Sequence, residues 1–578
     1  MNLYFGRIKA LRALMAREGW DAVVLTGSDP HASEYPAPRW KQVEWLTGFT
    51  GEAGDVVVTA DHSGLWTDTR YFIQAGRQLP GTGVELHKTR VPEQVLIPQW
   101  LGRQFSAGAR IAVDGLCMTA GMAKEIREAS GCEILSVPDL LSSLWEDRPS
   151  IPSTPVEVLS AGQVGASREE KIARLREWMG AVGCDGMLLT ALDEIAWLLN
   201  VRGRDIEYNP YVISSLLVTP GGVKWFAGRE DVALPGVEMF PYDAVRDALK
   251  GFRGRVCADP STLNLALLEA IPEPILRPSP VPLWKAVKNE VEIAAMRKAH
   301  LADGLACERF LYWLEKEIAA GHTVTEWMAA CRLGELRAQI PGYRGDSFET
   351  ISAYGEGAAL PHYVTPRGGG ACLQPRGLYL VDSGGQYLTG TTDITRTVAL
   401  GPCSELERDD YTRVLQGHIA LSAAVFPKGT AGCQIDALAR EPLWKVRRNF
   451  GHGTGHGVGF YLGVHEGPQD IRQNFNSQPL LPGMVVSDEP GIYREGLHGV
   501  RHENLLLCVP DGDSEFGSFL RFEPLTLCHF DTAPLERSLL TESERASLNA
   551  YHARVYDTLS PLLEPEIAAW LREKTLPV

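Results

Sequence analysis

The sequence lacks the features that mark several large classes of protein. It has no run of 18 uncharged apolar residues, which excludes a membrane-spanning helix. It also has no G-x-S-x-G, H-E-x-x-H, C-x-x-C or G-x-x-x-x-G-K-S/T motif, so a serine nucleophile elbow, a zincin helix, a dithiol site and a phosphate-binding loop are not indicated. Neither a basic block nor an acidic tail accompanies the net charge of −16, which argues against nucleic acid and anionic membranes as partners.

Cysteine is present but shows no disulfide framework. The eleven cysteines, an odd number, are spread without framework spacing, which is typical of reduced thiols. The first 23 residues indicate an amphipathic helix with charges throughout, and they lack the uninterrupted apolar core of a signal peptide. We therefore expect a cytoplasmic protein.

An internal repeat organises the first half of the chain. RIKALRALMAREGWDAVVLTGSD at residues 7–29 aligns without gaps with KIARLREWMGAVGCDGMLLTALD at residues 171–193. Each copy predicts a helix, an aspartate and then a buried strand. We therefore predict two copies of one α/β domain, residues 1–155 and 165–284, joined by a Pro/Ser-rich linker.

The second half begins after another proline-rich segment, RPSPVPLW at residues 277–284. Apolar spacing predicts helices at residues 290–319, 324–338, 404–426 and 434–447, with β-runs between them. The β-runs form antiparallel hairpins, so we predict an α+β domain over residues 285–512 and not a parallel dinucleotide fold. Residues 513–578 are predicted to form a strand and helices that extend this domain.

Five potential metal ligands follow one another in turn-forming or glycine-rich contexts: Asp382, Asp393, His456, Glu489 and Glu503. The two aspartates end LYLVD and QYLTGTTD, two β-runs that can form a hairpin. The two glutamates flank a second predicted hairpin, whose PG and EG pairs supply the turns. His456 lies in GHGTGHGVG, which is too glycine-rich for a stable helix. Such a chain can bring four carboxylates and one imidazole together.

Four carboxylates at close range require a cation, because like charges would otherwise force several of them to protonate. Two divalent ions meet this need, and carboxylates can bridge two ions roughly 3.5 to 4 Å apart. Oxygen ligands with a single nitrogen suit Mn²⁺ best, with Zn²⁺, Co²⁺ or Fe²⁺ as alternatives. Any one of these acids could be an ordinary loop residue, but the ordered set predicts a dinuclear centre.

The phrases around these ligands carry a family resemblance. VDSGGQYLTGTTDITRT, GHGTGHGVGFYLGVHEGP and SDEPGIYREGLHGVRHENLLL closely resemble the pita-bread metallopeptidases, specifically the long, three-domain aminopeptidase P (Xaa-Pro aminopeptidase) family. The resemblance runs nearly end to end. It implies duplicated α/β N-terminal domains of the creatinase-N, ribonuclease H-like type, a pita-bread α+β catalytic domain and a C-terminal extension.

Carried over position by position, the resemblance also implies roles for individual residues. Asp382 would chelate one ion, Asp393 and Glu503 would bridge both ions, and His456 and Glu489 would complete the other site. Glu489 would also accept and donate the proton during catalysis. The implied substrate-binding residues are His362 and His465, which also stabilise the transition state, His452 in the substrate pocket, and Arg501 beside the metals.

The implied activity is that of a proline-specific metalloprotease, a hydrolase that removes the first residue from peptides with proline in second position. A water between two divalent ions ionises near neutral pH, so a metal-bridging hydroxide can attack the peptide carbonyl without a protein nucleophile. The substrate's free amine would bind beside a metal and Asp393, which explains why only one residue is released. Proline has a fixed φ and no backbone N–H, so a pocket shaped for its ring selects this bond.

Other functions on the same fold are alternatives. A prolidase-like Xaa-Pro dipeptidase shares the five ligands, but the duplicated N-terminal module and the long tail favour the aminopeptidase. A non-catalytic binding protein, or a creatine-type hydrolase that works without metals, would not need all five ligands. Two positions depart from the family: His502, where an aliphatic residue is expected, and Ser487, where threonine is usual. We expect position 502 to point away from the metals.

The C-terminal tail has an apolar stripe formed by Tyr551, Leu559, Leu563, Ala568 and Leu571. The family resemblance makes this tail a dimerisation element, and so we expect a homodimer. The alternative is an ordinary helix packed on its own catalytic domain.

Overall fold

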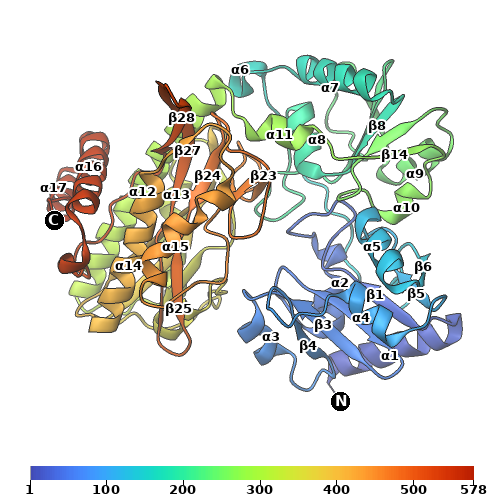
Figure 1. The fold of residues 1–578 in the computed structure, drawn as a ribbon, viewed down its shortest axis with the longest axis horizontal. Helices are drawn as coiled ribbons and strands as arrows, with labels where there is room; N and C mark the ends of the chain where they lie inside the picture. Colours follow the sequence, from blue (N-terminus) through green and yellow to red (C-terminus); the bar gives the residue numbers. More distant parts are fainter. Residues whose placement is uncertain (1) are drawn as a thin grey trace. The chain divides into compact units, whose positions relative to one another are not determined.

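The computed structural model describes residues 2–578, which divide into two compact units (Figure 1). Unit 1 comprises Met1–Ala161 and Ala166–Val281, and unit 2 comprises Gly162–Gly165 and Pro282–Val578. Unit 1 therefore holds both predicted N-terminal domains, and unit 2 holds the predicted catalytic domain together with the C-terminal extension.

The first half of unit 1 is a six-stranded mixed sheet covered by helices. The strand order is β4-β3-β2-β1-β5-β6, with β1 (Ala22–Leu25) at the centre. β1 runs antiparallel to β2 and parallel to β5, and both faces carry apolar cores. The other elements of this half are α1 (Leu3–Glu18), α2 (Gln42–Thr47), β2 (Asp55–Thr59), β3 (Ser63–Thr67), α3 (Phe72–Gln78), β4 (Glu85–Lys88), α4 (Ile97–Gln104), β5 (Arg110–Val113), α5 (Ala120–Ser130) and β6 (Glu133–Ser136).

The second half of unit 1 repeats this topology. Its strand order, β12-β11-β10-β8-β13-β14, matches the first sheet position by position. α7 (Arg168–Val182) precedes the central strand β8 (Gly186–Leu189) as α1 precedes β1, which confirms the predicted repeat. The remaining elements are β7 (Glu157–Val158), α6 (Ala161–Val164), α8 (Leu192–Leu199), β9 (Val201–Arg202), β10 (Ser215–Val218), β11 (Val223–Phe226), β12 (Glu238–Phe240), α9 (Val245–Lys250), β13 (Val256–Ala258), α10 (Leu265–Leu268), β14 (Pro274–Leu276) and α11 (Val281–Ala286).

Unit 2 contains the four predicted long helices. α12 (Glu290–Ala319) begins at the predicted residue because Asn289 and Glu292 form a capping box. The other three are shorter than predicted by one to four residues at one or both ends: α13 (Glu326–Ala338), α14 (Glu405–Ser422) and α15 (Asp436–Trp444). Helix ends are where apolar spacing carries least information.

All strand pairs of unit 2 among the described residues are antiparallel, as predicted for an α+β domain. They form three larger sheets, with orders β15-β18-β19, β16-β17-β20 and β21-β28-β27-β24-β22-β23, and a hairpin β25-β26. The strands are β15 (Tyr343–Asp346), β16 (Ile351–Tyr354), β17 (Leu378–Ser383), β18 (Gly385–Tyr387), β19 (Gly390–Thr391), β20 (Ile394–Ala399), β21 (Val425–Pro427), β22 (Gly455–Gly457), β23 (Glu466–Ile471), β24 (Val485–Asp488), β25 (Gly491–Arg494), β26 (His498–Arg501), β27 (Asn504–Ser514) and β28 (Gly517–Pro524).

The chain closes with α16 (Glu542–Leu559) and α17 (Pro565–Lys574), which pack on α12 within the same unit. Of the predicted apolar stripe, Leu559, Leu563 and Leu571 are buried in a core shared with Phe310 and Leu314 of α12. These side chains therefore pack inside the same chain. This arrangement agrees with the alternative prediction, an ordinary helix packed on its own catalytic domain.

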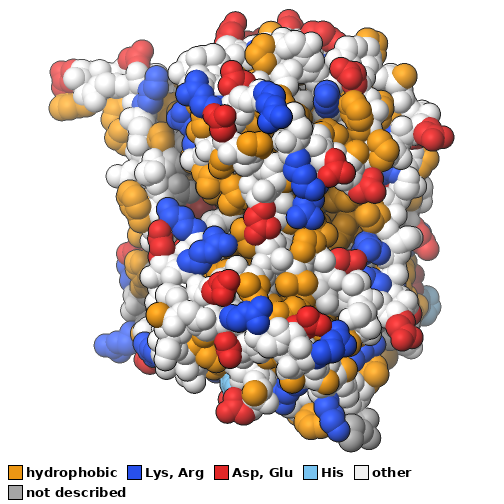
Figure 2. Space-filling view, turned by 90° about the vertical axis from the view of Figure 1, so that its right-hand side faces the viewer, with side chains coloured by type: hydrophobic (Ala, Val, Ile, Leu, Met, Phe, Trp, Pro, Cys, Tyr) orange, Lys and Arg blue, Asp and Glu red, His pale blue; other side chains and the backbone are white. Residues whose placement is uncertain are grey.

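Among the described residues, no helix combines the length and the apolarity that a membrane span requires. The eleven cysteines are all free. On the face drawn in Figure 2, basic side chains are interspersed with acidic and hydrophobic ones.

Candidate metal centre

Strands β17 and β20 bring the two aspartates together. They pair antiparallel, with Asp382 opposite Thr395, and Asp393 lies directly before β20. One detail differs from the prediction: QYLTGTTD does not pair with LYLVD but contributes to a separate small hairpin, β18-β19. Gly384, between β17 and β18, lies so close to Thr392 that only glycine fits. A Cβ there would lie 2.0 Å from the Thr392 carbonyl oxygen.

Backbone contacts join the other three ligands to this pair. The Glu489 N–H donates to the carbonyl of Thr454, close to His456 on β22 (2.8 Å), and the Glu503 N–H donates to the carbonyl of Thr395 (3.1 Å). The predicted hairpin between the two glutamates is confirmed as β25-β26. Residues far apart in the sequence therefore meet at one place in unit 2.

The ligand atoms face one another. His456 Nε2 lies 3.5 Å from Asp393 Oδ2 and 3.5 Å from Glu489 Oε1. Asp393, His456 and Glu503 each offer a ligand atom within 4.8 Å of the others. The His456 Nδ1–H donates to the Gly457 carbonyl (2.9 Å), so the lone pair of Nε2 is directed at the carboxylates.

The electrostatics of this cluster fit bound cations. Burial is the main cause that raises the pKa of Asp382, of Glu489 to about 7, and of Glu503, and neighbouring carboxylates raise each of them further. Asp382 Oδ1 and Glu503 Oε1 are buried without a hydrogen-bond partner among the described residues. Buried carboxylate oxygens that lack a donor and face one another are suited to divalent ions, so the donor set fits the predicted metals.

A chain of hydrogen bonds surrounds the ligands. Arg501 Nη2 donates to Asp382 Oδ2 (2.5 Å), and its Nη1 donates to the hydroxyl of Tyr493 (2.7 Å). Tyr493 lies 2.8 Å from His452 Nε2, and the His452 Nδ1–H donates to the Gly453 carbonyl. Burial, with the charge of Arg501, lowers the pKa of His452 to about 3, so its neutral Nε2 accepts a hydrogen bond from the Tyr493 hydroxyl.

The two remaining predicted histidines lie in the same neighbourhood. The His465 ring meets the His456 ring edge to face, with centroids 4.3 Å apart. The charge of His362 is among the causes that lower the pKa of His452. The structure therefore joins eight of the nine predicted residues in one cluster in unit 2, and the ninth, His362, acts on His452 through its charge.

Sequence reasoning missed Thr395 and Tyr493. Thr395 Oγ1 accepts a hydrogen bond from Arg501 Nε (3.2 Å) and donates to Glu503 Oε2 (2.8 Å). The only signal available was the place of each residue inside a matched phrase, DITRT or GIYRE. Ser487, one of the two departures, keeps a hydroxyl that accepts from the His456 N–H (2.9 Å).

His502, the other departure, points away from the metals as expected. Its buried ring packs between Tyr411 and Phe530, at centroid distances of 4.4 and 5.5 Å.

Arg396 is a further buried residue that supports the centre. It donates to the carbonyls of Glu503 (2.6 Å), Cys528 (2.7 Å) and His529 (2.9 Å), and its guanidinium lies over the Phe530 ring. It also donates to the Tyr551 hydroxyl on α16 (3.1 Å). The C-terminal extension is therefore joined directly to the backbone of a predicted bridging ligand.

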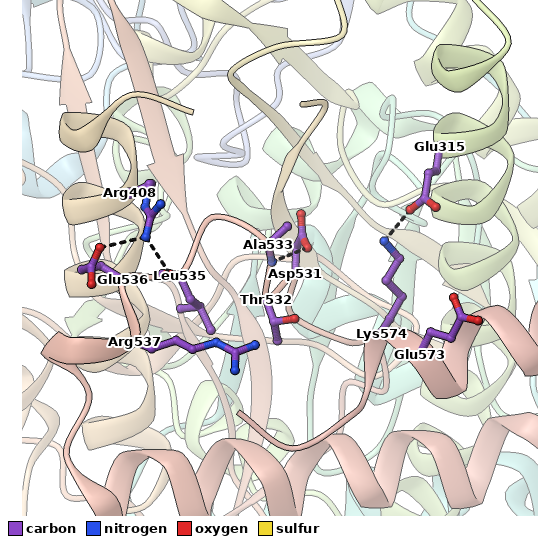
Figure 3. A pocket seen from close by; sticks show the side chains of 10 residues that line it. All are labelled: Glu315, Arg408, Asp531, Thr532, Ala533, Leu535, Glu536, Arg537, Glu573 and Lys574. Carbon is purple, nitrogen blue, oxygen red and sulfur yellow. Dashed lines mark hydrogen bonds and ion pairs between the residues drawn. The ribbon is translucent and has the colours of Figure 1, made fainter. Parts of the chain in front are cut away.

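A separate cavity of about 540 Å³ opens between α12, α14, α17 and the segment from Asp531 to Arg537 (Figure 3). Four of its charged side chains form two ion pairs, Arg408 with Glu536 (2.8 Å) and Lys574 with Glu315 (2.5 Å). None of the nine predicted site residues lines it.

Comparison with known protein families divides the chain into four matched segments. Residues 294–510 match Metallopeptidase family M24, and residues 518–578 match the C-terminal region of peptidase M24. Residues 7–144 and 147–292 each match a Creatinase/Prolidase N-terminal domain.

Individual relatives are similar over nearly the whole chain. Aminopeptidase P2 of Arabidopsis thaliana is 36% identical, covering 99% of this chain and 88% of that protein. A probable Xaa-Pro aminopeptidase P of Laccaria bicolor is 38% identical, covering 99% and 93%. The solved X-prolyl aminopeptidase of Caenorhabditis elegans is 35% identical, with a TM-score of 0.96 over 100% of both chains. It is described as a cytosolic enzyme with a di-nuclear active site. A Xaa-Pro dipeptidase from Bacillus anthracis, 27% identical with a TM-score of 0.51, covers 64% of this chain and 99% of its own.

Proposed function

The chain belongs to metallopeptidase family M24, with two creatinase-type N-terminal domains, and we propose that it is a metal-dependent aminopeptidase that hydrolyses the bond between an N-terminal residue and a following proline. The observation that carries this function is the likeness along the entire chain to enzymes named aminopeptidase P or X-prolyl aminopeptidase. The dipeptidase comparison leaves about a third of the chain without a counterpart, which favours the aminopeptidase over a prolidase.

Asp382, Asp393, His456, Glu489 and Glu503 would hold two divalent ions, and Mn²⁺ suits this donor set best. When bound, such ions polarise the scissile carbonyl and lower the pKa of the attacking water. Glu489, beside His456 Nε2, is the proton acceptor and then the donor to the leaving proline nitrogen. A carboxylate suits this role because it can return the same proton that it takes up.

His465 and His362 donate hydrogen bonds to the substrate carbonyl as it becomes an oxyanion. The ring contact of His465 with His456 supports this role, because it lies against a ligand. His452, whose two ring nitrogens bond Gly453 and Tyr493, would act as a neutral wall of the substrate pocket. Arg501 would hold Asp382 in its ligating orientation and lie beside the substrate.

Release of a single residue requires that the enzyme recognise a free α-amine. Asp393, whose Oδ2 lies 3.5 Å from His456 Nε2, is the proposed partner of that amine. The proline ring then occupies the next position, where its fixed φ and missing N–H distinguish it from other residues.

We further propose a cytoplasmic homodimer. The cytosolic description of the Caenorhabditis elegans enzyme and the free cysteines support the compartment. The homodimer rests on the family resemblance of the C-terminal extension.

The test is release of the N-terminal residue from Arg-Pro-Pro and Gly-Pro by protein that has been stripped with chelator and then given Mn²⁺. Metal-restored cleavage of the tripeptide is expected. Cleavage of the dipeptide alone would identify a prolidase instead. Metal binding without cleavage of either peptide would contradict the proposed substrate class.

A further inference from the structure

A second cluster of ligand-type side chains lies in unit 1, at one edge of its first sheet. It consists of His62, Glu85 and His87. His62 lies in the turn between β2 and β3, and the other two are on the edge strand β4, two residues apart and therefore on the same side. β3 and β4 run parallel, so Trp66 lies opposite His87.

The two imidazoles converge. His62 Nε2 and His87 Nε2 lie 3.1 Å apart, and one ligand atom from each of the three residues lies within 4.8 Å of the others. Two histidine nitrogens bound to one tetrahedral Zn²⁺ at 2.0–2.1 Å are separated by about 3.3–3.4 Å. The observed separation is therefore within a few tenths of an ångström of that required for shared coordination.

Neighbouring rings hold this arrangement in place. His87 stacks on Trp66 with centroids 3.9 Å apart and planes 8° apart, and His62 lies against Trp100 with centroids 5.0 Å apart. Because both rings are packed, the ligands need little reorganisation to bind an ion. Preorganised ligands bind metals more tightly than mobile ones.

Gly64 provides the space between the rings. A Cβ at this position would lie 2.7 Å from His87 Cδ2 and 2.8 Å from His62 Nε2, too close for either ring to remain in place. Its backbone does not have a positive φ, so glycine is needed here for room and not for conformation.

The cluster is accessible from solvent, and its charge suits a divalent cation. The side chain of Glu85 is 76% exposed and that of His62 is 20% exposed, so an ion can enter from solvent. Burial and the charge of His62 lower the pKa of His87, which favours the neutral imidazole that ligates metals. One carboxylate then balances part of the charge of a divalent cation.

We propose that His62, Glu85 and His87 bind one divalent transition-metal ion, for which Zn²⁺ is the best match to two nitrogens and one oxygen. Two imidazoles and a carboxylate with an open fourth position are a common set of protein ligands for zinc. The ion joins the β2–β3 turn to β4 and so closes the edge of the sheet. This site is separate from the centre of unit 2 and from its chemistry.

The test is the number of Zn²⁺ ions retained per chain by the Mn²⁺-loaded enzyme after equilibrium dialysis against Zn²⁺, measured by elemental analysis. The wild type is expected to hold one more Zn²⁺ than His62→Ala, Glu85→Ala and Gly64→Ala. Exchange of Zn²⁺ into the centre of unit 2 is common to all of these proteins and cancels in the comparison. Glu85→Ala guards against misfolding because its side chain is mostly exposed.

His322→Ala is the matched control. His322 forms an exposed pair with Glu317, at 2.7 Å between Nδ1 and Oε2, without a second histidine. This variant should retain the extra ion, and all variants should cleave Arg-Pro-Pro at the wild-type rate. Equal Zn²⁺ content in wild type and His62→Ala, or an equal loss in His322→Ala, would overturn the proposal.

Discussion

The hydroxyl of Thr395 connects Arg501 to Glu503. It accepts a hydrogen bond from Arg501 Nε and donates to Glu503 Oε2. Groups that orient a metal ligand typically account for 10–100-fold in metal affinity or activity, by order of magnitude. We therefore expect Thr395→Val to lose roughly 10–100-fold in kcat/KM on Arg-Pro-Pro or in Mn²⁺ affinity.

Thr395→Ser is the matched control, because it keeps the hydroxyl and removes only a methyl group. It should remain within a few-fold of the wild type. Equal losses in the serine and valine variants would show that packing, not the hydrogen bond, is what matters at this position.

Glu503→Gln tests the ligand set directly. The substitution preserves the shape of a buried side chain but removes the charge of the proposed bridge. We expect the protein to fold, to hold about one Mn²⁺ where the wild type holds two, and to lose more activity than Thr395→Val. Elemental analysis and peptide cleavage measure both effects. Substantial turnover by a variant that holds neither ion would rule out the dinuclear assignment.

His552 makes the stability of unit 2 depend on pH. Its buried Nε2 accepts the Phe530 N–H (3.1 Å), and burial lowers its pKa to about 3. The unfolded chain takes up a proton near pH 6.5 that the folded chain does not, so this stabilisation is complete above pH 6.5 and is lost as the pH falls towards 3. Between pH 7.5 and 5.5 we expect a loss of roughly 1 kcal/mol from this group.

Thermal unfolding at the two pH values, in wild type and His552→Gln, measures this contribution. The variant should be less stable at pH 7.5 and less sensitive to acid. His322→Gln, at an exposed position, should keep the wild-type dependence. The idea fails if wild type and His552→Gln lose the same stability on acidification.

The site residues that were predicted from the sequence have recognisable local contexts, whereas those that were missed depend on contacts between distant segments. Four of the five ligands lie at or directly beside the end of a strand, and the fifth, His456, lies in a short strand between two glycines. Such contexts can be recognised from a few neighbouring residues. The roles of Thr395 and Arg396 arise from contacts with residues more than 100 positions away, and no local pattern records them. Tyr493 is missed because its hydroxyl reaches Arg501 only once β25 and β26 pair.

Between elements, close packing in unit 2 depends on glycine. Gly417, inside α14, faces α15, and a Cβ there would lie 2.1 Å from the Ala439 carbonyl oxygen. Gly334, inside α13, has nothing within 4 Å of the corresponding position. The same substitution should therefore have opposite effects in the two helices.

We expect Gly417→Ala to destabilise unit 2 by about 1–3 kcal/mol, because the two helices must move apart. Gly334→Ala should stabilise it by about 0.5–1 kcal/mol, because alanine restricts the unfolded helix segment more than glycine does. Thermal or denaturant unfolding of both variants checks the pair. A stabilising Gly417→Ala would contradict the packing argument.

Elements with strong local signals were predicted closely. The capping box at Asn289 marks the start of α12 in the sequence itself. The small hairpin β18-β19 was misassigned because apolar alternation shows that a segment is a strand but not which strand it pairs with. The observed pairing includes a close approach at Gly384 that leaves no room for a Cβ.

At the scale of the molecule, the two units should respond differently to metal removal. The five ligands all lie in unit 2. An ion that binds only the folded state stabilises that state, by about 2.7 kcal/mol when its free concentration is 100 times Kd. With Mn²⁺ as the only added metal, chelation should lower the melting transition of unit 2 and leave that of unit 1 in place.

Differential scanning calorimetry with and without chelator measures this difference. The unit 1 transition serves as the internal control, and Glu503→Gln should show a smaller chelator effect than the wild type. An equal shift of both transitions would mean that Mn²⁺ binding is not confined to unit 2.

The hydrogen bonds of Arg396 also bear on how the protein is made. The ligands extend from Asp382 to Glu503, but the carbonyl of Glu503 is held by a side chain that also binds the backbone at residues 528 and 529 and the hydroxyl of Tyr551. During synthesis, a nascent chain that has emerged only as far as residue 510 has every ligand but lacks this support. We therefore expect stable metal loading to follow the synthesis of the C-terminal extension, after unit 1 has had time to fold.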